Sequence, residues 1–284
     1  MELKSIGVIG AGIMGSGIAQ VCAMAGRDVL LVDVSAAALD RSVSGMHEAL
    51  ARMQSKGRIT EEEKSAALAR IRTTTEYGDL ADCDAIIEAA TENEQLKLKI
   101  LQRVEEVARP DAIIASNTSS ISITKLASAG KKQPDRFIGM HFFNPVPVLN
   151  LVELIPGLQT SEATLESARE LVVAIGKTPI VVKNSPGFAV NRILCPMINE
   201  AIFVLQEGLA SAQDIDAGMK LGCSHPIGPL ALADLIGLDT LLSVLDTFYT
   251  AFNDPKYRPA TLLREMVDAG RLGRKSGRGF YHYF

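Results

Sequence analysis

Four side chains in this sequence could exchange a proton with a substrate near neutral pH: His47, His141, His225 and His282. Only His141 directly follows a buried strand-like run, residues 137–140, so it would lie at the carboxyl end of a strand. Oxidation of an alcohol needs a base that takes the hydroxyl proton while hydride leaves the carbon, and histidine fits that requirement. His141 is therefore the candidate base, although a lone buried histidine is also consistent with a hydrogen-bonded core residue.

Glu153 is the candidate partner of this base. It is the one carboxylate in an apolar, strand-like run at 151–155. A histidine that acts as a base needs a group on its second ring nitrogen that fixes the tautomer and stabilises the imidazolium. The alternative interpretation is that Glu153 points into solvent from an edge strand.

A glycine-rich turn near the start of the chain predicts a dinucleotide site. The run 5–9 is apolar and β-branched, the turn 10–15 reads GAGIMG, and residues 16–25 have helical spacing. The first glycine of such a turn makes the tight bend, the second lets the backbone approach a pyrophosphate, and the third lets helix pack on strand. The pyrophosphate then lies at the positive end of the helix. The expected cofactor-binding residues of this turn are Gly10, Gly12, Ile13, Met14 and Gly15.

Asp33 indicates which dinucleotide is bound. A second buried run, 29–32, ends in this acid. It lies about twenty residues past the glycines, where a dinucleotide-binding unit places the carboxylate that holds a ribose hydroxyl. That carboxylate would repel a 2′-phosphate, and neither Val34 nor Ser35 supplies the arginine that a phosphate favours. We therefore expect NAD rather than NADP.

Strand and helix patterns alternate as far as residue 183 and then stop alternating. Strands are expected at 5–9, 29–32, 84–89, 112–116, 137–140, 151–155 and 179–182, and helices at 16–25, 35–55, 60–69, 93–108 and 164–175. This pattern predicts an α/β fold with a Rossmann-type doubly wound, mostly parallel sheet and a helical-hairpin insertion after Asp33.

The pattern beyond residue 188 is helical only, which predicts an all-α C-terminal domain. The turn-rich segment 184–187 separates an NAD-binding domain, 1–184, from a second domain, 185–284. Apolar runs such as 230–233 exceed what so small a helical domain can bury by itself. We therefore expect the second domain to make the contacts of a homodimer, together with contacts to the substrate.

The tip of the inserted helical hairpin is basic, with Lys56 and Arg58 on either side of Gly57. An acidic chain needs a local cation of this kind to hold an anionic ligand. Charge clusters are also commonly solvated, so the tip alone is equally consistent with a turn that simply faces water.

Composition excludes several classes of partner. The 284 residues carry a net charge of -4, with 47% hydrophobic and 22% charged residues, which is typical of a globular protein without general attraction to nucleic acid or to an anionic membrane. Its four cysteines form no CxxC pair, so no metal site is expected and a reducing compartment is favoured. Met1 leads almost directly into the first strand, so we expect no export signal and a cytoplasmic location.

Several longer motifs resemble those of the L-3-hydroxyacyl-CoA dehydrogenases, and specifically the short bacterial members that act on 3-hydroxybutyryl-CoA. The resemblance covers essentially the whole chain, and its later motifs are more specific than the glycines. The motifs are IGVIGAGIMG at 6–15, SNTSS at 116–120, HFFNPVP at 141–147, LVE at 151–153, NSPGFAVNR at 184–192 and GRGFY at 277–281.

The resemblance implies roles for individual residues. His141 and Glu153 would form a catalytic dyad, with Ser119 and Asn191 as hydrogen-bond partners of the substrate oxygens. Besides the glycine-rich turn, the positions implied to touch NAD are Asp33, Glu92, Lys97, Asn117, Ser119, Asn144 and Lys275. Lys56 and Ser119 would contact the coenzyme A part of the substrate. From its pattern alone, Lys97 would be taken for an ordinary helix-surface lysine.

The implied activity is the reversible, NAD-dependent oxidation of (S)-3-hydroxyacyl-CoA, foremost (S)-3-hydroxybutyryl-CoA, to the 3-oxoacyl-CoA. Two alternatives stay open: a related β-hydroxyacid dehydrogenase that acts on a free acid, and a non-catalytic NAD-binding protein with the same fold. The first would use a catalytic lysine in place of a histidine–glutamate pair. The His141 motif argues against the first alternative, and the presence of Ser119, His141, Glu153 and Asn191 disfavours the second.

Overall fold

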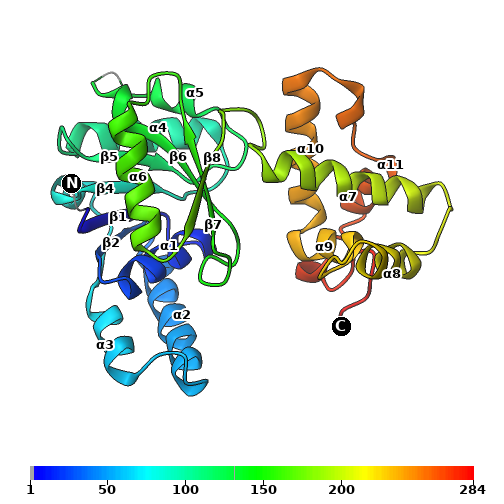
Figure 1. Ribbon diagram of the computed structural model, residues 1–284, viewed down its shortest axis with the longest axis horizontal. Helices are drawn as coiled ribbons and strands as arrows, with labels where there is room; N and C mark the ends of the chain where they lie inside the picture. The colour runs from blue at the N-terminus through cyan, green and yellow to red at the C-terminus, as the bar shows by residue number, and fades with distance from the viewer. Residues whose placement is uncertain (1–2, 131) are drawn as a thin grey trace. The chain divides into compact units, whose positions relative to one another are not determined.

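The computed structural model describes residues 3–130 and 132–284 of the chain (Figure 1). The chain divides into two compact units, Met1–Ser185 and Pro186–Phe284. Each unit has its own hydrophobic core. Among the described residues, no helix combines the length and the apolar composition that crossing a membrane requires.

One eight-stranded sheet forms the centre of the first unit. Its order is β3-β2-β1-β4-β5-β6-β7-β8, and every neighbouring pair is parallel except the antiparallel pair β6 and β7. The order reverses between β1 and β4, and ligands of open α/β sheets bind outside the carboxyl ends of the strands at such a reversal. The strands are β1 Ser5–Ile9, β2 Asp28–Val32, β3 Ile71–Thr74, β4 Ala85–Glu88, β5 Ile113–Ser116, β6 Phe137–Phe142, β7 Leu151–Pro156 and β8 Thr178–Val181.

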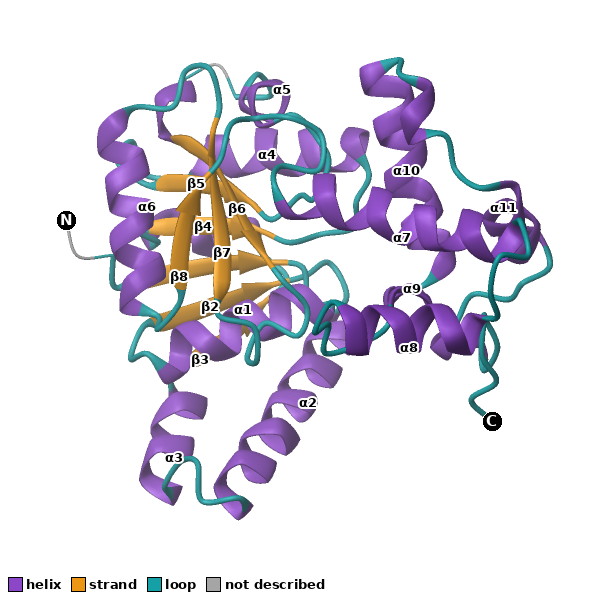
Figure 2. Ribbon diagram, turned by 45° about the vertical axis from the view of Figure 1, so that its right-hand side comes forward, coloured by secondary structure: helices purple, strands orange, loops and turns teal. Residues whose placement is uncertain are grey.

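Helices cover this sheet (Figure 2). They are α1 Ile13–Met24, α2 Ala36–Ser55, α3 Glu61–Ala69, α4 Glu94–Val107, α5 Ile123–Ala127 and α6 Glu162–Ala174, with short 3₁₀ turns η1 Tyr77–Asp82 and η2 Pro134–Arg136. Helix α1 packs on β1 and β2 and α6 on β6 to β8, whereas α4 contacts β4 and α5 contacts β6. Helices α2 and α3 form the inserted hairpin, and α3 begins with a capping box between Thr60 and Glu63.

The predicted Rossmann-type sheet with a helical-hairpin insertion is confirmed. Among the strands and α-helices of this unit, β3 and α5 had no counterpart in the prediction. Strand β3 is a four-residue edge strand of sequence IRTT with two exposed side chains, so it has no apolar run, and α5 has only five residues. Strand β6 also extends past the predicted 137–140, because β7 pairs with His141 and Phe142 as well.

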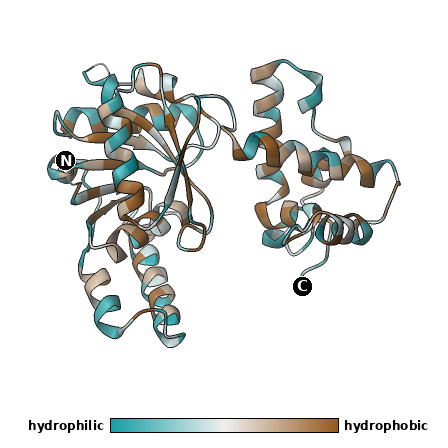
Figure 3. Cartoon of the chain, viewed as in Figure 1, coloured by the Kyte–Doolittle hydropathy of each residue, from teal (hydrophilic) through white to brown (hydrophobic). Residues whose placement is uncertain are grey.

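The second unit is helical, as predicted. Its helices are α7 Val190–Gln206, α8 Ala212–Gly222, α9 Pro229–Ile236, α10 Leu238–Phe252 and α11 Thr261–Asp268, with 3₁₀ turns η3 Pro255–Tyr257 and η4 Arg274–Ser276. Apolar residues gather on α7 and α9 (Figure 3). The core of this unit includes Ile198 and Ile202 of α7, Leu230 of α9, and Leu245 and Phe248 of α10.

Candidate active site

The glycine-rich turn joins β1 to α1 and leaves the start of the helix open. Gly10 has a φ of +104°, and a Cβ there would lie 2.8 Å from the carbonyl oxygen of Ala89. A Cβ at Gly15 would overlap the Gly10 carbonyl oxygen, whereas one at Gly12 would meet nothing within 4 Å. Gly12 is the N-cap residue, and no side chain caps the helix. The amide end of α1 therefore offers the space and the partial positive charge that a pyrophosphate needs.

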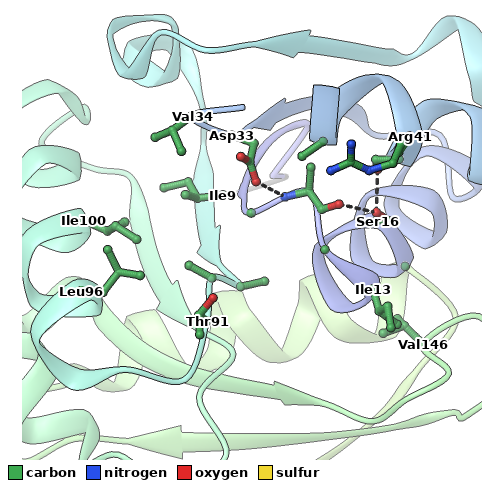
Figure 4. A pocket seen from close by; sticks show the side chains of 18 of the residues that line it. Ile9, Ile13, Ser16, Asp33, Val34, Arg41, Thr91, Leu96, Ile100 and Val146 are labelled. Atoms are coloured by element: carbon green, nitrogen blue, oxygen red, sulfur yellow. Dashed lines mark hydrogen bonds between the residues drawn. The ribbon is translucent and has the colours of Figure 1, made fainter. Parts of the chain in front are cut away.

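Asp33 is fixed at the carboxyl end of β2. Its Oδ2 accepts a hydrogen bond from the backbone N–H of Ala11 at 2.8 Å (Figure 4). Its Oδ1 accepts one from the backbone N–H of Ser35 at 2.9 Å. Each carboxylate oxygen has lone pairs to spare for a further donor. The anchored carboxylate can therefore bind ribose hydroxyls beside the turn and would repel a 2′-phosphate.

A cavity of about 1180 Å³ opens above this turn. Apolar side chains, including Val34, Leu96 and Ile100, line it on one side of Asp33, while Arg41 lies on the other side, next to Ser16 (Figure 4). The predicted cofactor residues that line the cavity are Gly10, Gly12, Ile13, Asp33 and Asn144. The volume of the cavity, the glycines of the turn and the Asp33 carboxylate together fit a dinucleotide.

Several charged or aromatic residues of this cavity were not anticipated from the sequence, among them two arginines and a tyrosine. Arg41, Tyr77 and Arg103 all line it, and the guanidinium of Arg103 lies 5.2 Å from the centre of the Tyr77 ring. The sequence context of the two arginines gave no signal, because single cations on a helix usually face solvent.

His141 and Glu153 are direct neighbours across the antiparallel pair β6 and β7. Nδ1 of His141 lies 2.7 Å from Oε2 of Glu153. Glu153 is fully buried and His141 is 5% exposed. A carboxylate at Nδ1 favours the tautomer with the proton on that nitrogen, so that Nε2 is the ring nitrogen that can take up a proton, and it stabilises the imidazolium that then forms. The structure thus joins two residues that the sequence places in separate strands.

Asn117 and Asn144 follow the carboxyl ends of the neighbouring strands β5 and β6. The side-chain oxygen of Asn117 accepts a hydrogen bond from the backbone N–H of Phe142 at 2.8 Å. Asn117 therefore ties the end of β5 to the end of β6, next to His141. Asn144 lies three residues after His141 and reaches the cavity.

Glu92 holds the turn that carries Ser119. Its Oε1 lies 2.6 Å from Oγ1 of Thr118, 2.9 Å from the backbone nitrogen of Ser119 and 3.1 Å from that of Ser120. Burial opposes the ionised form of Glu92, but the positive charge of Lys97 and these hydrogen bonds outweigh it and hold the pKa of Glu92 below its ordinary value. The carboxylate is therefore charged at neutral pH and fixes the geometry of residues 118–120.

Lys97 is a buried cation rather than a helix-surface lysine. Only 1% of its side chain is exposed, and its Nζ lies 2.7 Å from Oε1 of Glu88 and 3.5 Å from Oε2 of Glu92. Glu88 was not among the site residues predicted from the sequence. The sequence did contain one indication of a functional role for Glu88. This acid is the last residue of a buried strand, and Asp33 directly follows a buried strand.

Lys56 is exposed at the tip of the inserted hairpin, where it is the C-cap residue of α2. Asn191 and Lys275 belong to the second unit. Asn191 lies in the first turn of α7, and the guanidinium of Arg192 beside it lies 3.7 Å from the centre of the Phe252 ring. Lys275 Nζ donates to a carboxylate oxygen of Asp239 at 2.6 Å.

Comparison with known families matches both units. The model described as "3-hydroxyacyl-CoA dehydrogenase, NAD binding domain" matches residues 5–185. The model described as "3-hydroxyacyl-CoA dehydrogenase, C-terminal domain" matches residues 187–283. Together the two models cover nearly the whole chain.

Individual relatives are similar over the same length. The chain is 54% identical over 281 residues to a 3-hydroxybutyryl-CoA dehydrogenase of Bradyrhizobium diazoefficiens, covering 99% of this chain and 96% of that protein. It is 42% identical over 289 residues to the mitochondrial hydroxyacyl-coenzyme A dehydrogenase of Rattus norvegicus, covering 99% and 91%. The crystal structure of (S)-3-hydroxybutyryl-CoA dehydrogenase PaaH1 from Ralstonia eutropha is similar with a TM-score of 0.96 and 60% identity, covering 100% of both chains.

Proposed function

The chain belongs to the 3-hydroxyacyl-CoA dehydrogenase family, and from this membership and the geometry of the site we propose that it interconverts (S)-3-hydroxybutyryl-CoA and acetoacetyl-CoA with NAD(H). The observation that carries the proposal is the buried contact of 2.7 Å between His141 Nδ1 and Glu153 Oε2. A free-acid dehydrogenase with a catalytic lysine would not need this pair, and a non-catalytic protein would have no use for a base with its partner already in place.

His141 performs the proton chemistry in this proposal. In oxidation, its Nε2 takes the proton of the 3-hydroxyl group, and Glu153 stabilises the imidazolium at Nδ1. In reduction, the imidazolium donates the proton back to the oxygen at C3. The chemistry that bound NAD supplies is hydride transfer to and from C3 of the substrate.

Three further side chains would bind and orient the substrate. We propose that the Ser119 hydroxyl and the Asn191 amide hydrogen-bond the substrate oxygens, and that Lys56 holds a phosphate of coenzyme A. A lysine exposed on a hairpin tip suits such a phosphate, since the chain as a whole carries a net charge of -4.

The cofactor site would use the turn and the strand ends of the first unit. The pyrophosphate would lie at the start of α1, against Gly12 and Ile13, and a ribose would hydrogen-bond Asp33. We further propose that contacts to NAD are also made by Glu92, Lys97, Asn117, Ser119, Asn144 and, from the second unit, Lys275.

An activity assay tests the proposal directly. Purified protein should consume NADH when acetoacetyl-CoA is added, and it should not do so with acetoacetate, which lacks the coenzyme A part. Consumption with the free acid alone would favour the β-hydroxyacid dehydrogenase alternative. Absence of turnover with both, together with tight NADH binding, would favour a non-catalytic NAD-binding protein.

We also propose a homodimer formed by the second domain, 185–284, with 1–184 as the NAD-binding domain. Several large apolar side chains of this domain are exposed, among them Ile193 at 71%, Leu209 at 68% and Leu221 at 85%. Apolar surface of this kind is commonly covered by a second subunit. Light scattering at micromolar concentration should give twice the mass of one chain, and a monomer mass would contradict the proposal.

The four cysteines of the chain are free thiols. Thiols persist in reducing compartments, whereas exported proteins commonly pair them. We therefore propose that the protein works in the cytoplasm, which cell fractionation with an antibody to the protein would test.

A further inference from the structure

Lys177 is a buried lysine that lies immediately before β8. It is 8% exposed, and its Nζ donates to the carbonyl oxygens of Val146 at 2.6 Å and of Leu149 at 2.9 Å. Burial disfavours the charged form and lowers the pKa of Lys177 from its ordinary value. A buried ammonium is tolerated where hydrogen bonds replace the water it has lost. The two carbonyl groups therefore account for the position of this side chain.

Both carbonyl groups belong to the β6–β7 loop, residues 143–150. The backbone N–H groups of Val148 and Leu149 donate to the carbonyl oxygen of Pro145 at 3.0 Å each, so the middle of the loop is a compact turn. Carbonyl groups at the carboxyl end of such a turn have no partner within it, and a lysine can supply the missing donors. The Lys177 ammonium does so from outside the loop.

Side-chain packing holds only part of the β6–β7 loop. In this loop, all of which the structure describes, only Val146 is buried. Asn144, Val146 and Pro147 line the large cavity above the glycine-rich turn (Figure 4). Pro147 and Lys177 also line a second cavity, of about 380 Å³. A loop that borders two cavities has few neighbours to pack against, so its position depends strongly on the hydrogen bonds from Lys177.

Two residues of this loop lie at the active site. The centre of the Phe143 ring is 4.5 Å from that of the His141 ring. Asn144 follows β6 at the edge of the sheet where His141 lies, and it lines the large cavity. His141 and the transferred hydride both act at C3 of the substrate, so the nicotinamide ring would lie near His141. Asn144 is therefore placed at the nicotinamide end of the cofactor site.

We propose that Lys177 is a positioning residue, which holds the β6–β7 loop and thereby places Asn144 for binding the nicotinamide end of NAD. The proposal rests on the proposed function, in which Asn144 contacts NAD. Lys177 is not among the described residues that line the large cavity, so it acts through the loop.

Three variants test this role. Lys177→Met removes both hydrogen bonds but keeps the length of the side chain. Lys177→Arg keeps the donors, and the second cavity beside Lys177 has room for the larger guanidinium. Lys183→Met is the matched control, because Lys183 is an exposed lysine just after β8. Strand β8 is parallel to β7 and β7 is antiparallel to β6, so Lys183 lies at the opposite edge of the sheet from the end of β6.

The readouts are the Kd for NADH and the Kd for ADP-ribose, both from isothermal titration calorimetry. ADP-ribose has the adenine, the pyrophosphate and both riboses of NADH but lacks the nicotinamide ring. We expect Lys177→Met to raise the Kd for NADH about five- to tenfold, the worth of one lost hydrogen bond, and that for ADP-ribose by less than about twofold. Lys177→Arg and Lys183→Met should leave both constants near the native values. In an Asn144→Ala background, Lys177→Met should add little, because the two residues act as one unit.

Other results would overturn the proposal. An unchanged Kd for NADH in Lys177→Met would mean that the loop does not depend on the lysine. Equal rises for NADH and ADP-ribose, or full additivity with Asn144→Ala, would mean that Lys177 has a general structural role. Binding of NADH by Lys177→Arg that is as weak as in Lys177→Met would contradict the role of the two hydrogen bonds.

Folding and turnover are checked separately. If circular dichroism shows that Lys177→Met does not fold, Lys177→Gln takes its place under the same criteria. Failure of both variants to fold would mean that Lys177 only stabilises the fold, which contradicts the proposal. Native protein that binds NADH but does not turn over acetoacetyl-CoA would reject the proposed function, while the two binding constants would still decide the role of Lys177.

Discussion

His141 and Glu153 face each other across β6 and β7, with 2.7 Å between Nδ1 and Oε2, and the carboxylate is fully buried. The pairing register that aligns these two residues also aligns Met140 with Leu154 and Phe142 with Val152. Because side chains alternate along a strand, the polar pair lies on one face and these apolar pairs on the other. The dyad is therefore fixed by the sheet itself rather than by a mobile loop.

Replacement of His141 by alanine should abolish proton transfer and leave cofactor binding intact. We expect kcat for acetoacetyl-CoA reduction to fall by roughly 100- to 10,000-fold, the usual contribution of a general acid or base. The Kd for NADH should stay near the native value, because the turn at Gly12 and the Asp33 carboxylate are unchanged. The exposed His282 gives the control variant, His282→Ala. Comparable losses in both variants would argue against a special role for His141.

Glu153→Gln should also slow the reaction, although it preserves the shape of the side chain. The amide removes the negative charge that stabilises the imidazolium, so kcat should fall. The double variant with His141→Ala should be little slower than His141→Ala alone, since Glu153 acts only through the histidine. Additive losses in kcat would show that Glu153 contributes independently of His141.

Much of this architecture could be predicted from local patterns. The apolar runs of β1, β2, β4 and β5 are short and lie between helical patterns, so the order of elements and the fold class followed from the sequence. The glycines of the first turn predicted that α1 packs closely against β1 and the turn. At Gly15 the packing is so close that a Cβ would overlap the carbonyl oxygen of Gly10. Strand β3 could not be predicted, because it lies at the edge of the sheet and two of its four side chains are exposed. It therefore has no apolar run.

The candidate site was predictable in its residue types but not in its pairings. Sequence indicated His141 and Glu153 separately, and only the register between β6 and β7 brings them together. Lys97 shows the opposite case, since a lysine in an amphipathic helix resembles a solvent-facing residue until its partner is known. That partner, Glu88, is on a different element, and no spacing rule links the end of a strand to the first turn of the next helix.

Asp33 should determine the preference for NADH over NADPH. Its carboxylate is anchored by the N–H groups of Ala11 and Ser35, so a 2′-phosphate cannot displace it without breaking both hydrogen bonds. We expect a higher kcat/KM with NADH than with NADPH in the native protein. Asp33→Asn removes the repulsion and should narrow the preference by about tenfold or more, as expected for a lost charged hydrogen bond to the ribose. A native preference for NADPH would contradict this assignment.

Lys56 should contribute to binding of the thioester substrate but not of NADH. An exposed lysine–phosphate contact is worth on the order of 1 kcal/mol, so Lys56→Ala should raise KM for acetoacetyl-CoA about fivefold. The neighbouring Arg58 is also exposed, which makes Arg58→Ala a control for the general charge of the tip. Equal KM values for native protein and Lys56→Ala would mean that Lys56 only faces solvent.

Tyr283 should make the second unit sensitive to alkaline pH. Its hydroxyl donates to Oδ2 of the buried Asp234 at 2.9 Å, and burial together with this hydrogen bond raises the pKa of Tyr283 to about 12. Because the folded pKa lies above the unfolded value, the contribution to stability is complete below about pH 10 and is lost as pH rises towards 12. Tyr283→Phe should therefore lower the free energy of unfolding by about 1 kcal/mol at pH 8, the worth of one hydrogen bond. The difference from native protein, measured by urea denaturation at pH 8, 10 and about 11, should shrink as the pH rises above 10. A difference for Tyr283→Phe that stays constant over this range would show that the hydroxyl of Tyr283 does not stabilise the fold through Asp234.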